Sequence, residues 1–173
     1  MTNTFIRYFY LIFLIILSIK SQGNEQDKFK PNKFLEEFKL NLSTYKNNYE
    51  ESLRIAFQKK DSTAAANFIY EIAVIEQLKG RNNEASELYE KALTIFIKLN
   101  DSTGIANCIN QIGSIYRYRG SYDSAIQNYL HAKILFESID DTLGQIKALN
   151  NTGITYRLLH DYKLAKIHYR KSE

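Results

Sequence analysis

Apolar and small side chains recur every three or four residues through the middle of the chain. This spacing places side chains on one face of a helix, and it predicts two consecutive helices within residues 101–140. Gly120 separates them, and Ser121 is the predicted N-cap of the second helix, where its hydroxyl would accept a hydrogen bond from a free amide. The first stripe consists of Ile105, Cys108, Ile109, Ile112, Ile115 and Tyr116, and the second of Tyr122, Ala125, Ile126, Tyr129, Ala132 and Phe136.

The same pattern returns forty residues further along the chain. Six of the seven glycines form three such pairs, namely Gly80 with Gly120, Gly104 with Gly144, and Gly113 with Gly153. Glycine is retained where a side chain cannot fit or where the backbone needs positive φ, so the pairs indicate repeated backbone geometry. Residues 101–133 and 141–173 share nine identities. The sequence therefore predicts three units, at residues 61–100, 101–140 and 141–173, the last of them incomplete.

These units resemble the tetratricopeptide repeat (TPR) family, whose signature is W-x2-L-G-x2-Y, then A-x3-F, then a proline. In the middle unit the matching residues are Ile112, Gly113, Tyr116, Gly120, Tyr122, Ala125, Tyr129 and Ala132. The resemblance covers residues 61–173 and implies an all-α fold, an α-solenoid of antiparallel helix pairs. The resemblance extends weakly upstream. Residues 22–60 are therefore expected to be an N-terminal helix or a degenerate leading repeat, with the helix itself beginning at Pro31.

Several positions depart from the family pattern. Glu76 stands at a tyrosine position, Thr152 replaces an aliphatic residue, and His160 replaces the turn glycine. The interval of forty residues exceeds the thirty-four of the family signature, as in longer-period members of the family. We expect the extra residues to lengthen the second helix of each unit and its connection.

Near the N-terminus, uncharged and mostly apolar residues 8–19 lie between Arg7 and Lys20. As a helix, this run would span about 18 Å, well short of the roughly 30 Å hydrocarbon core of a membrane. It predicts a secretory signal peptide at residues 1–21 and therefore an exported, periplasmic protein. The alternative is an uncleaved membrane anchor formed by residues 8–19, which the flanking charges do not favour.

Charge and chemistry exclude several function classes. Removal of residues 1–21 would leave 21 basic and 19 acidic residues, a net charge of +2, and the basic residues are scattered, which argues against nucleic acid as a partner. Cys108 is the single cysteine and lies on an apolar stripe, so we expect it in the core. His131, His160 and His168 do not have metal-ligand spacing, and no phosphate loop or nucleophile motif occurs. We therefore expect no metal, no cofactor and no enzymatic activity.

The resemblance implies a groove, lined by the first helix of each unit, that binds a protein or peptide. Asparagine amides both donate and accept, which suits a peptide backbone, and arginine suits a carboxylate. The alternative is that these polar side chains are only solvated. The predicted peptide-binding residues are Asn67, Tyr70, Gln77, Asn107, Asn110, Ser114, Arg117, Lys147, Asn150 and Arg157, with Val74 and Ile154 on the same face.

The third unit stops at Glu173, part-way through its second helix, and this would leave Leu164, Ile167 and Tyr169 partly uncovered. We interpret the chain as a piece of a longer protein. The alternative is a natural terminus that a partner or a second copy of the chain covers. Two functions remain open: an exported scaffold that binds a protein or peptide, or the sensory region of a membrane-bound signalling protein with a histidine kinase or DNA-binding output domain.

Overall fold

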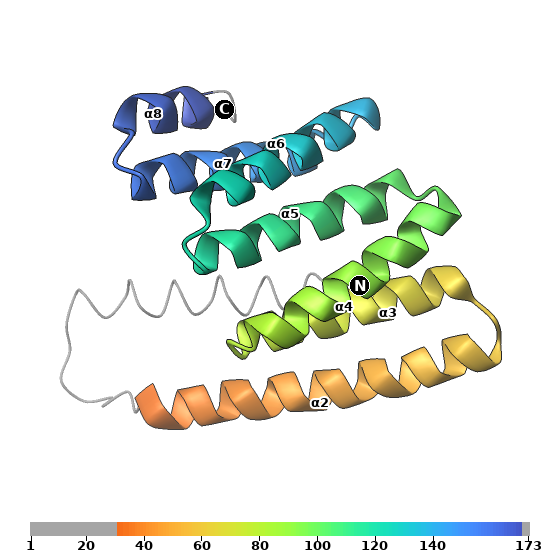
Figure 1. Ribbon diagram of the computed structural model, residues 1–173. Coiled ribbons are helices and arrows are strands. Elements are labelled where there is room, and N and C mark those ends of the chain that lie inside the picture. The colour runs from red at the N-terminus through yellow and green to blue at the C-terminus, as the bar shows by residue number, and fades with distance from the viewer. Residues whose placement is uncertain (1–30, 171–173) are drawn as a thin grey trace. The chain divides into compact units, whose positions relative to one another are not determined.

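The computed structural model describes residues 31–170, and all regular structure in that range is helical (Figure 1). The predicted all-α solenoid is confirmed. The helices are α2 (Pro31–Gln58), α3 (Ser62–Leu78), α4 (Asn82–Leu99), α5 (Ser102–Tyr118), α6 (Tyr122–Ser138), α7 (Thr142–Leu158) and α8 (Tyr162–Arg170). The long leading helix begins at Pro31, where the sequence predicts it, and the predicted signal peptide lies outside the described residues. Residues 39–170 belong to one compact unit.

Aspartates start the first helix of each pair. The side chains of Asp61, Asp101 and Asp141 each accept a hydrogen bond of 2.9 Å from the amide three residues further on. The predicted N-cap position of Ser121 is confirmed, but the predicted hydrogen bond from an amide to its hydroxyl is not formed. The backbone at Ser121 has a ψ of 68°, whereas the capping Asp101 has a ψ of 90°.

The turns between helices repeat their backbone geometry. Positive φ occurs in the turns that precede α3, α5 and α7, at Lys60, Asn100 and Asp140. The turns inside the pairs have positive φ at Gly80, Gly120 and His160. His160 thus occupies an inter-helix turn, as predicted, at a position where glycine would have no steric penalty.

Four glycines inside the helices lie where a side chain would collide with a neighbouring aromatic ring. A Cβ on Gly104 would lie 2.3 Å from Phe96, and a Cβ on Gly144 would lie 2.3 Å from Phe136. The same test gives 2.9 Å between Gly113 and Tyr129, and 2.7 Å between Gly153 and Tyr169. The prediction that paired glycines mark paired geometry is therefore correct, since each ring packs directly on backbone.

Consecutive helices from α3 to α8 pack against each other, and α5 also contacts α7. Cys108 is fully buried with Phe96, as predicted. Five tyrosines match the family signature and are therefore expected in the core: Tyr89, Tyr116, Tyr129, Tyr156 and Tyr169. Tyr89 and Tyr129 are fully buried, but the other three are only half-buried, which corrects that expectation. The first and second helices of the middle unit, α5 and α6, each contain 17 residues, and the expected lengthening of the second helix relative to the family repeat stays a prediction.

Candidate functional site

The residues predicted to bind a peptide all lie on α3, α5 and α7, and we refer to this set as the first-helix face. Two of them, Asn67 and Arg157, are exposed. Asn110 is buried, with 9% of its surface exposed. The remaining members are half-buried: Tyr70, Gln77, Asn107, Ser114, Arg117, Lys147 and Asn150, together with the apolar Val74 and Ile154. Most of the face is thus recessed between neighbouring helices rather than fully solvated.

A hydrogen-bond chain organises this face on α5. Nε of Arg117 donates to the hydroxyl of Tyr129 at 3.2 Å, and this hydroxyl donates to Oγ of Ser114 at 3.2 Å. The Ser114 hydroxyl in turn donates to the backbone carbonyl of Asn110 at 3.3 Å. Arg117 has no ion pair within residues 38–170, so its terminal guanidinium nitrogens remain available to a carboxylate. The structure therefore brings together three of the predicted residues and orients one of them.

The tyrosine that orients Arg117 comes from α6, the second helix of the pair, and its role was missed in the sequence, where it was assigned only to the core. An equivalent contact exists one unit earlier, where the hydroxyl of Tyr89 donates to Oε1 of Gln77 at 2.8 Å. The ring of Tyr89 also lies 5.5 Å from that of Tyr70. A recurring interval of twelve residues, from 77 to 89 and from 117 to 129, is the pattern that could have revealed these pairs.

Asn110 is the main correction to the predicted face. It was expected to be exposed to a ligand, but it lies between α5 and α7, where its Oδ1 accepts a hydrogen bond of 3.3 Å from Nδ2 of Asn151. Helix–helix packing therefore engages this amide. Asn67 also uses its amide internally, since Nδ2 donates to the backbone carbonyl of Thr63 at 3.0 Å. Asn107 and Asn150 are the half-buried asparagines that remain on the face.

On α5 and α7 the charged residues are all positive. Helices α5 and α7 contain no aspartate or glutamate, and they contribute Arg117, Lys147 and Arg157. Within residues 38–170, the exposed Arg157 side chain has no hydrogen-bond or ion-pair partner. Like charges in a recessed surface raise the local concentration of groups of opposite charge. This part of the face favours a carboxylate-bearing ligand.

Glu76 on α3 does not offset this positive charge, because two cations already pair with its carboxylate. Its Oε1 lies 2.9 Å from Nζ of Lys46 on α2, and its Oε2 lies 3.0 Å from Nε of Arg81. The Glu76 side chain is 3% exposed. Its hydrogen bond to Lys46 is the main cause that raises the pKa of the lysine ammonium above its usual value. The position that holds tyrosine in the next two units thus holds an ion-pair cluster that joins α2 to α3.

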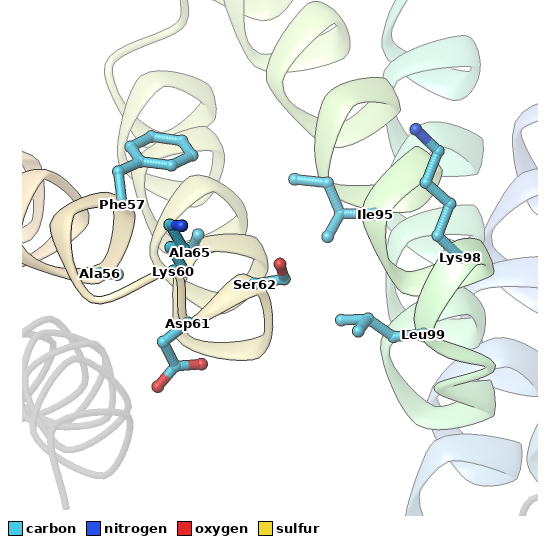
Figure 2. A pocket seen from close by; sticks show the side chains of 9 residues that line it. All are labelled: Ala56, Phe57, Lys60, Asp61, Ser62, Ala65, Ile95, Lys98 and Leu99. Atoms are coloured by element: carbon cyan, nitrogen blue, oxygen red, sulfur yellow. The ribbon is translucent and has the colours of Figure 1, made fainter.

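A separate pocket of about 310 Å³ lies at the opposite end of α3 (Figure 2). It is formed by the last turn of α2, the first turn of α3 and the last turns of α4. Figure 2 shows Ile95 and Leu99 reaching from α4 toward the two other helices. The lining residues are Ala56, Phe57, Lys60, Asp61, Ser62, Ala65, Ile95, Lys98 and Leu99. None of them belongs to the first-helix face.

The part of the chain that the structure describes contains neither a candidate metal site nor a candidate membrane-spanning helix. No group of three or more histidine, cysteine, aspartate or glutamate side chains there could hold a metal ion. No helix in that part combines the length and the apolar character that crossing a membrane requires.

Comparisons with solved structures agree on the architecture. The crystal structure of BtubC (BKLC) from P. vanneervenii aligns with a TM-score of 0.68 and 22% identity over 76% of this chain and 54% of that chain. The apo form of RapI aligns with a TM-score of 0.67 and 22% identity over 78% of this chain and 38% of that chain. A putative kinesin light chain of Podosopora anserina with nearly identical TPR-like repeats aligns with a TM-score of 0.62 and 14% identity, over 81% and 70%.

These likenesses show the fold, and the chain spans about half or less of the first two proteins. No curated protein sequence matches the chain. The model of the tetratricopeptide repeat family matches residues 61–132 and 105–173, which together extend over residues 61–173. This fold is generally a non-enzymatic scaffold for protein interaction, built from stacked repeats. The chain belongs to the tetratricopeptide repeat family.

Proposed function

We propose that this protein is a non-enzymatic scaffold that binds a protein or peptide segment along the first-helix face, and that the segment carries carboxylates. The positive charge of α5 and α7, neither of which carries an acidic residue, is the observation that supports this most. A peptide rich in aspartate and glutamate would pair with Arg117, Lys147 and Arg157, whereas a basic peptide would be repelled. The half-buried Asn107 and Asn150 are placed to bond its backbone.

Pre-positioning favours Arg117 as the anchor of this interaction. Its Nε donates a hydrogen bond to the hydroxyl of Tyr129, so part of the conformational entropy that the side chain would lose on binding is already lost in the free protein. A guanidinium also presents its donors in a planar fork that a carboxylate fits in a bidentate manner. A test of this site therefore removes the arginine charges and leaves the asparagines in place.

A library of random twelve-residue peptides displayed on phage would be selected against the 173-residue chain. We expect enriched peptides to contain more aspartate and glutamate than the starting library. Fluorescence anisotropy then measures their affinity for wild type and for the double variant Arg117→Gln with Arg157→Gln. Loss of two charge-assisted contacts should weaken binding by about tenfold or more.

The matched control removes the same charge from the second helices. Lys91 on α4 and Lys166 on α8 are exposed, and Lys91→Gln with Lys166→Gln gives the same net charge as the arginine variant. This control should bind as wild type does. A library with no enriched sequence, or equal affinity for all three proteins, would exclude the first-helix face as a peptide site.

We further propose export to the periplasm, supported by the apolar residues 8–19 and by Arg7, which precedes them. Fractionation of expressing cells and N-terminal sequencing of the product test this, since cleavage near residue 21 is the expected result. The alternative of a sensory region predicts further repeats, an apolar segment of about twenty residues and an output domain beyond Glu173. Sequencing of the gene past that codon distinguishes the two, and an immediate stop codon favours the scaffold.

The exposed apolar residues of α8 support a second kind of contact. Ile167 is 40% exposed, and Leu164 and Tyr169 are half-buried, as the sequence predicted. A following helix, a partner or a second copy of the chain would cover them. Light scattering of the chain distinguishes a homo-oligomer formed through α8 from a monomer.

A further inference from the structure

The pocket at the junction of α2 and α3 has a buried apolar floor and a rim that is partly charged. Ala56 is 4% exposed and Ala65 is 1% exposed, and they form the floor. Phe57, Ile95 and Leu99 provide apolar walls, while Lys60 and Lys98 stand at the rim. In Figure 2, Ile95 and Leu99 face Ala65 and Ser62 across the opening.

Internal repetition explains why the space exists. Forty residues beyond Ala56 and Ala65 stand Phe96 and Ile105. Phe96 is buried in a cluster against which Ile105 packs, and Ile105 also packs against the next cluster, which includes Ala132 and Phe136 of α6. The corresponding space between α4, α5 and α6 is therefore filled by two large side chains. At the α2–α3 junction both are alanine, and a pocket of about 310 Å³ remains.

The charges of the rim also distinguish this junction from the next one. The positions equivalent to Lys60 and Lys98 hold Asn100 and Ser138, which are uncharged. Within residues 38–170, neither lysine ammonium takes part in an ion pair. The aspartate at the rim, Asp61, forms no ion pair with either lysine, and its Oδ1 accepts the hydrogen bond from the amide of Ala64 that caps α3. Its charge offsets one of the two lysines, so the three rim groups together carry a net charge of +1.

We propose that this pocket binds a small amphipathic carboxylate, with a single ring or branched apolar group on the alanine floor and the carboxylate at Lys60 and Lys98. The apolar group takes the space that phenylalanine and isoleucine side chains fill one unit later. The lysines supply the charge that the next junction lacks. A volume of about 310 Å³ is at the lower end of the range for ligand sites, which suits one ring rather than a larger molecule. The site is independent of the first-helix face.

Hydrocinnamate is the probe for this proposal, since it joins one phenyl ring to one carboxylate through a short chain. Titration of the 173-residue chain by isothermal calorimetry or NMR should give a dissociation constant on the order of a millimolar, as expected for a ligand of this size. Propionate lacks the ring and hydrocinnamyl alcohol lacks the charge. Each should bind at least tenfold more weakly, and equal binding of all three would overturn the proposal.

Two sets of variants locate the binding. Ala65→Ile introduces the residue of the next unit and should abolish hydrocinnamate binding by filling the pocket. Lys60→Gln with Lys98→Gln alters only exposed residues and should weaken hydrocinnamate about fivefold while leaving the alcohol unchanged. Lys91→Gln, an exposed change elsewhere on α4, should have no effect.

Circular dichroism establishes that each variant is folded. If Ala65→Ile does not fold, the lysine variant still decides, because a preference for hydrocinnamate over the alcohol as large as that of wild type would then contradict the proposal. Unchanged hydrocinnamate binding by a folded Ala65→Ile variant would also contradict it.

Discussion

At Gly104 the space for a side chain is already occupied, because an added Cβ would lie 2.3 Å from Cδ1 of Phe96. Since the Phe96 ring is 2% exposed and enclosed by its cluster, it cannot move aside freely. Alanine is also the better helix former, which offsets part of the collision. We therefore predict that Gly104→Ala lowers the free energy of unfolding by about 1–2 kcal/mol, measured by urea denaturation.

Thr103→Ala is the control for Gly104→Ala, since Thr103 is exposed and adjacent in α5. It should leave the free energy of unfolding within about 0.5 kcal/mol of wild type. In the double variant with Phe96→Leu, the smaller side chain should relieve the collision, so that the two changes cost less together than their sum. If Gly104→Ala is as stable as Thr103→Ala, the packing of ring on backbone is wrong.

Cys108 should be chemically inert while the protein is folded. Burial is the main cause that raises the pKa of its thiol to about 12, and Asp101 adds to the effect. The thiolate, which is the reactive species, is thus scarce at neutral pH. We predict labelling by iodoacetamide at pH 8 at least about a hundredfold slower than for glutathione.

In urea the same thiol should react at an ordinary rate, because the unfolded chain restores its usual pKa. The direction with pH follows from linkage: above the unfolded pKa the unfolded thiol loses its proton first, so ionisation of Cys108 favours unfolding as pH rises toward 12. Rapid labelling of the folded protein would show that Cys108 is accessible.

The sequence predicted some of these residue environments and not others, for a physical reason. A glycine repeated between units has few explanations, and both of them, positive φ at Gly120 and a ring against Gly113, are realised. A polar residue on the first helix of a unit has many more explanations. Asn110 faces a neighbouring helix rather than solvent, and only the position of α7 decides this. The hydrogen bond from Arg117 to the hydroxyl of Tyr129 likewise depends on how α5 and α6 pack against each other.

Among the helices, N-caps should differ in their contribution to stability. Asp101 accepts a hydrogen bond of 2.9 Å from the amide of Gly104, whereas Ser121 makes no cap hydrogen bond. We predict that Asp101→Ala lowers the free energy of unfolding by about 1 kcal/mol, within the range for lost caps. Ser121→Ala should cost clearly less. Thermal or urea unfolding of the two variants measures the difference, and equal losses would contradict the assignment of caps.

The ion pair between Lys46 and Glu76 should hold α2 against α3. Lys46→Met keeps the apolar stem and removes the ammonium, while Arg81 still pairs with the carboxylate. The side chain of Lys46 is 27% exposed, so we expect a loss of about 1 kcal/mol, between surface and buried pairs. Hydrogen exchange of the α2 amides beyond residue 46 should accelerate severalfold.

Lys39→Met is the matched control in the same helix, because Lys39 is exposed and should leave the exchange of α2 unchanged. The raised pKa of Lys46 gives the sign of the pH effect. Its contribution is fully present at neutral pH and is lost as pH rises above the usual range for lysine, where the ammonium loses its proton. Identical protection of α2 in both variants would mean that the ion pair contributes nothing.

Helix positions were predictable because the apolar stripes, and the glycines and aspartates at helix ends, are local signals in the sequence. The ion-pair cluster on Glu76 was not, although the departure from tyrosine at that position was visible. Its partner Lys46 is thirty residues away on α2, and no local spacing connects them.

At the scale of the molecule, the first-helix face and the pocket arise in opposite ways, one from residues that the units share and the other from a difference between units. The first-helix face includes residues that the units share, such as Arg117 and Arg157, and one of its predicted members, Asn110, is buried. The pocket comes from a difference between units, where Ala56 replaces a phenylalanine. A vacancy of this kind depends on how three helices meet, so an alignment of units shows the substitution but not the space.

Because consecutive helices provide most of the packing, a destabilising substitution at one end should affect only the helices near it. In Gly153→Ala the new methyl group would press on Tyr169, whose ring is half-buried on α8. We predict that amide exchange accelerates in α7 and α8 and is unchanged in α3 and α4. In Gly113→Ala the methyl group would press on the fully buried Tyr129, in the middle of the array.

Gly113→Ala should therefore accelerate exchange in α5 and α6 and in the adjoining α4 and α7, with a larger loss of stability than Gly153→Ala because Tyr129 has less room to move. Hydrogen exchange with peptide-level mass spectrometry separates the two patterns, since each helix gives its own peptides. Uniform acceleration from α3 to α8 in both variants would mean that these helices unfold as a single cooperative block. Nearest-neighbour stacking of repeats would then not describe the stability of this protein.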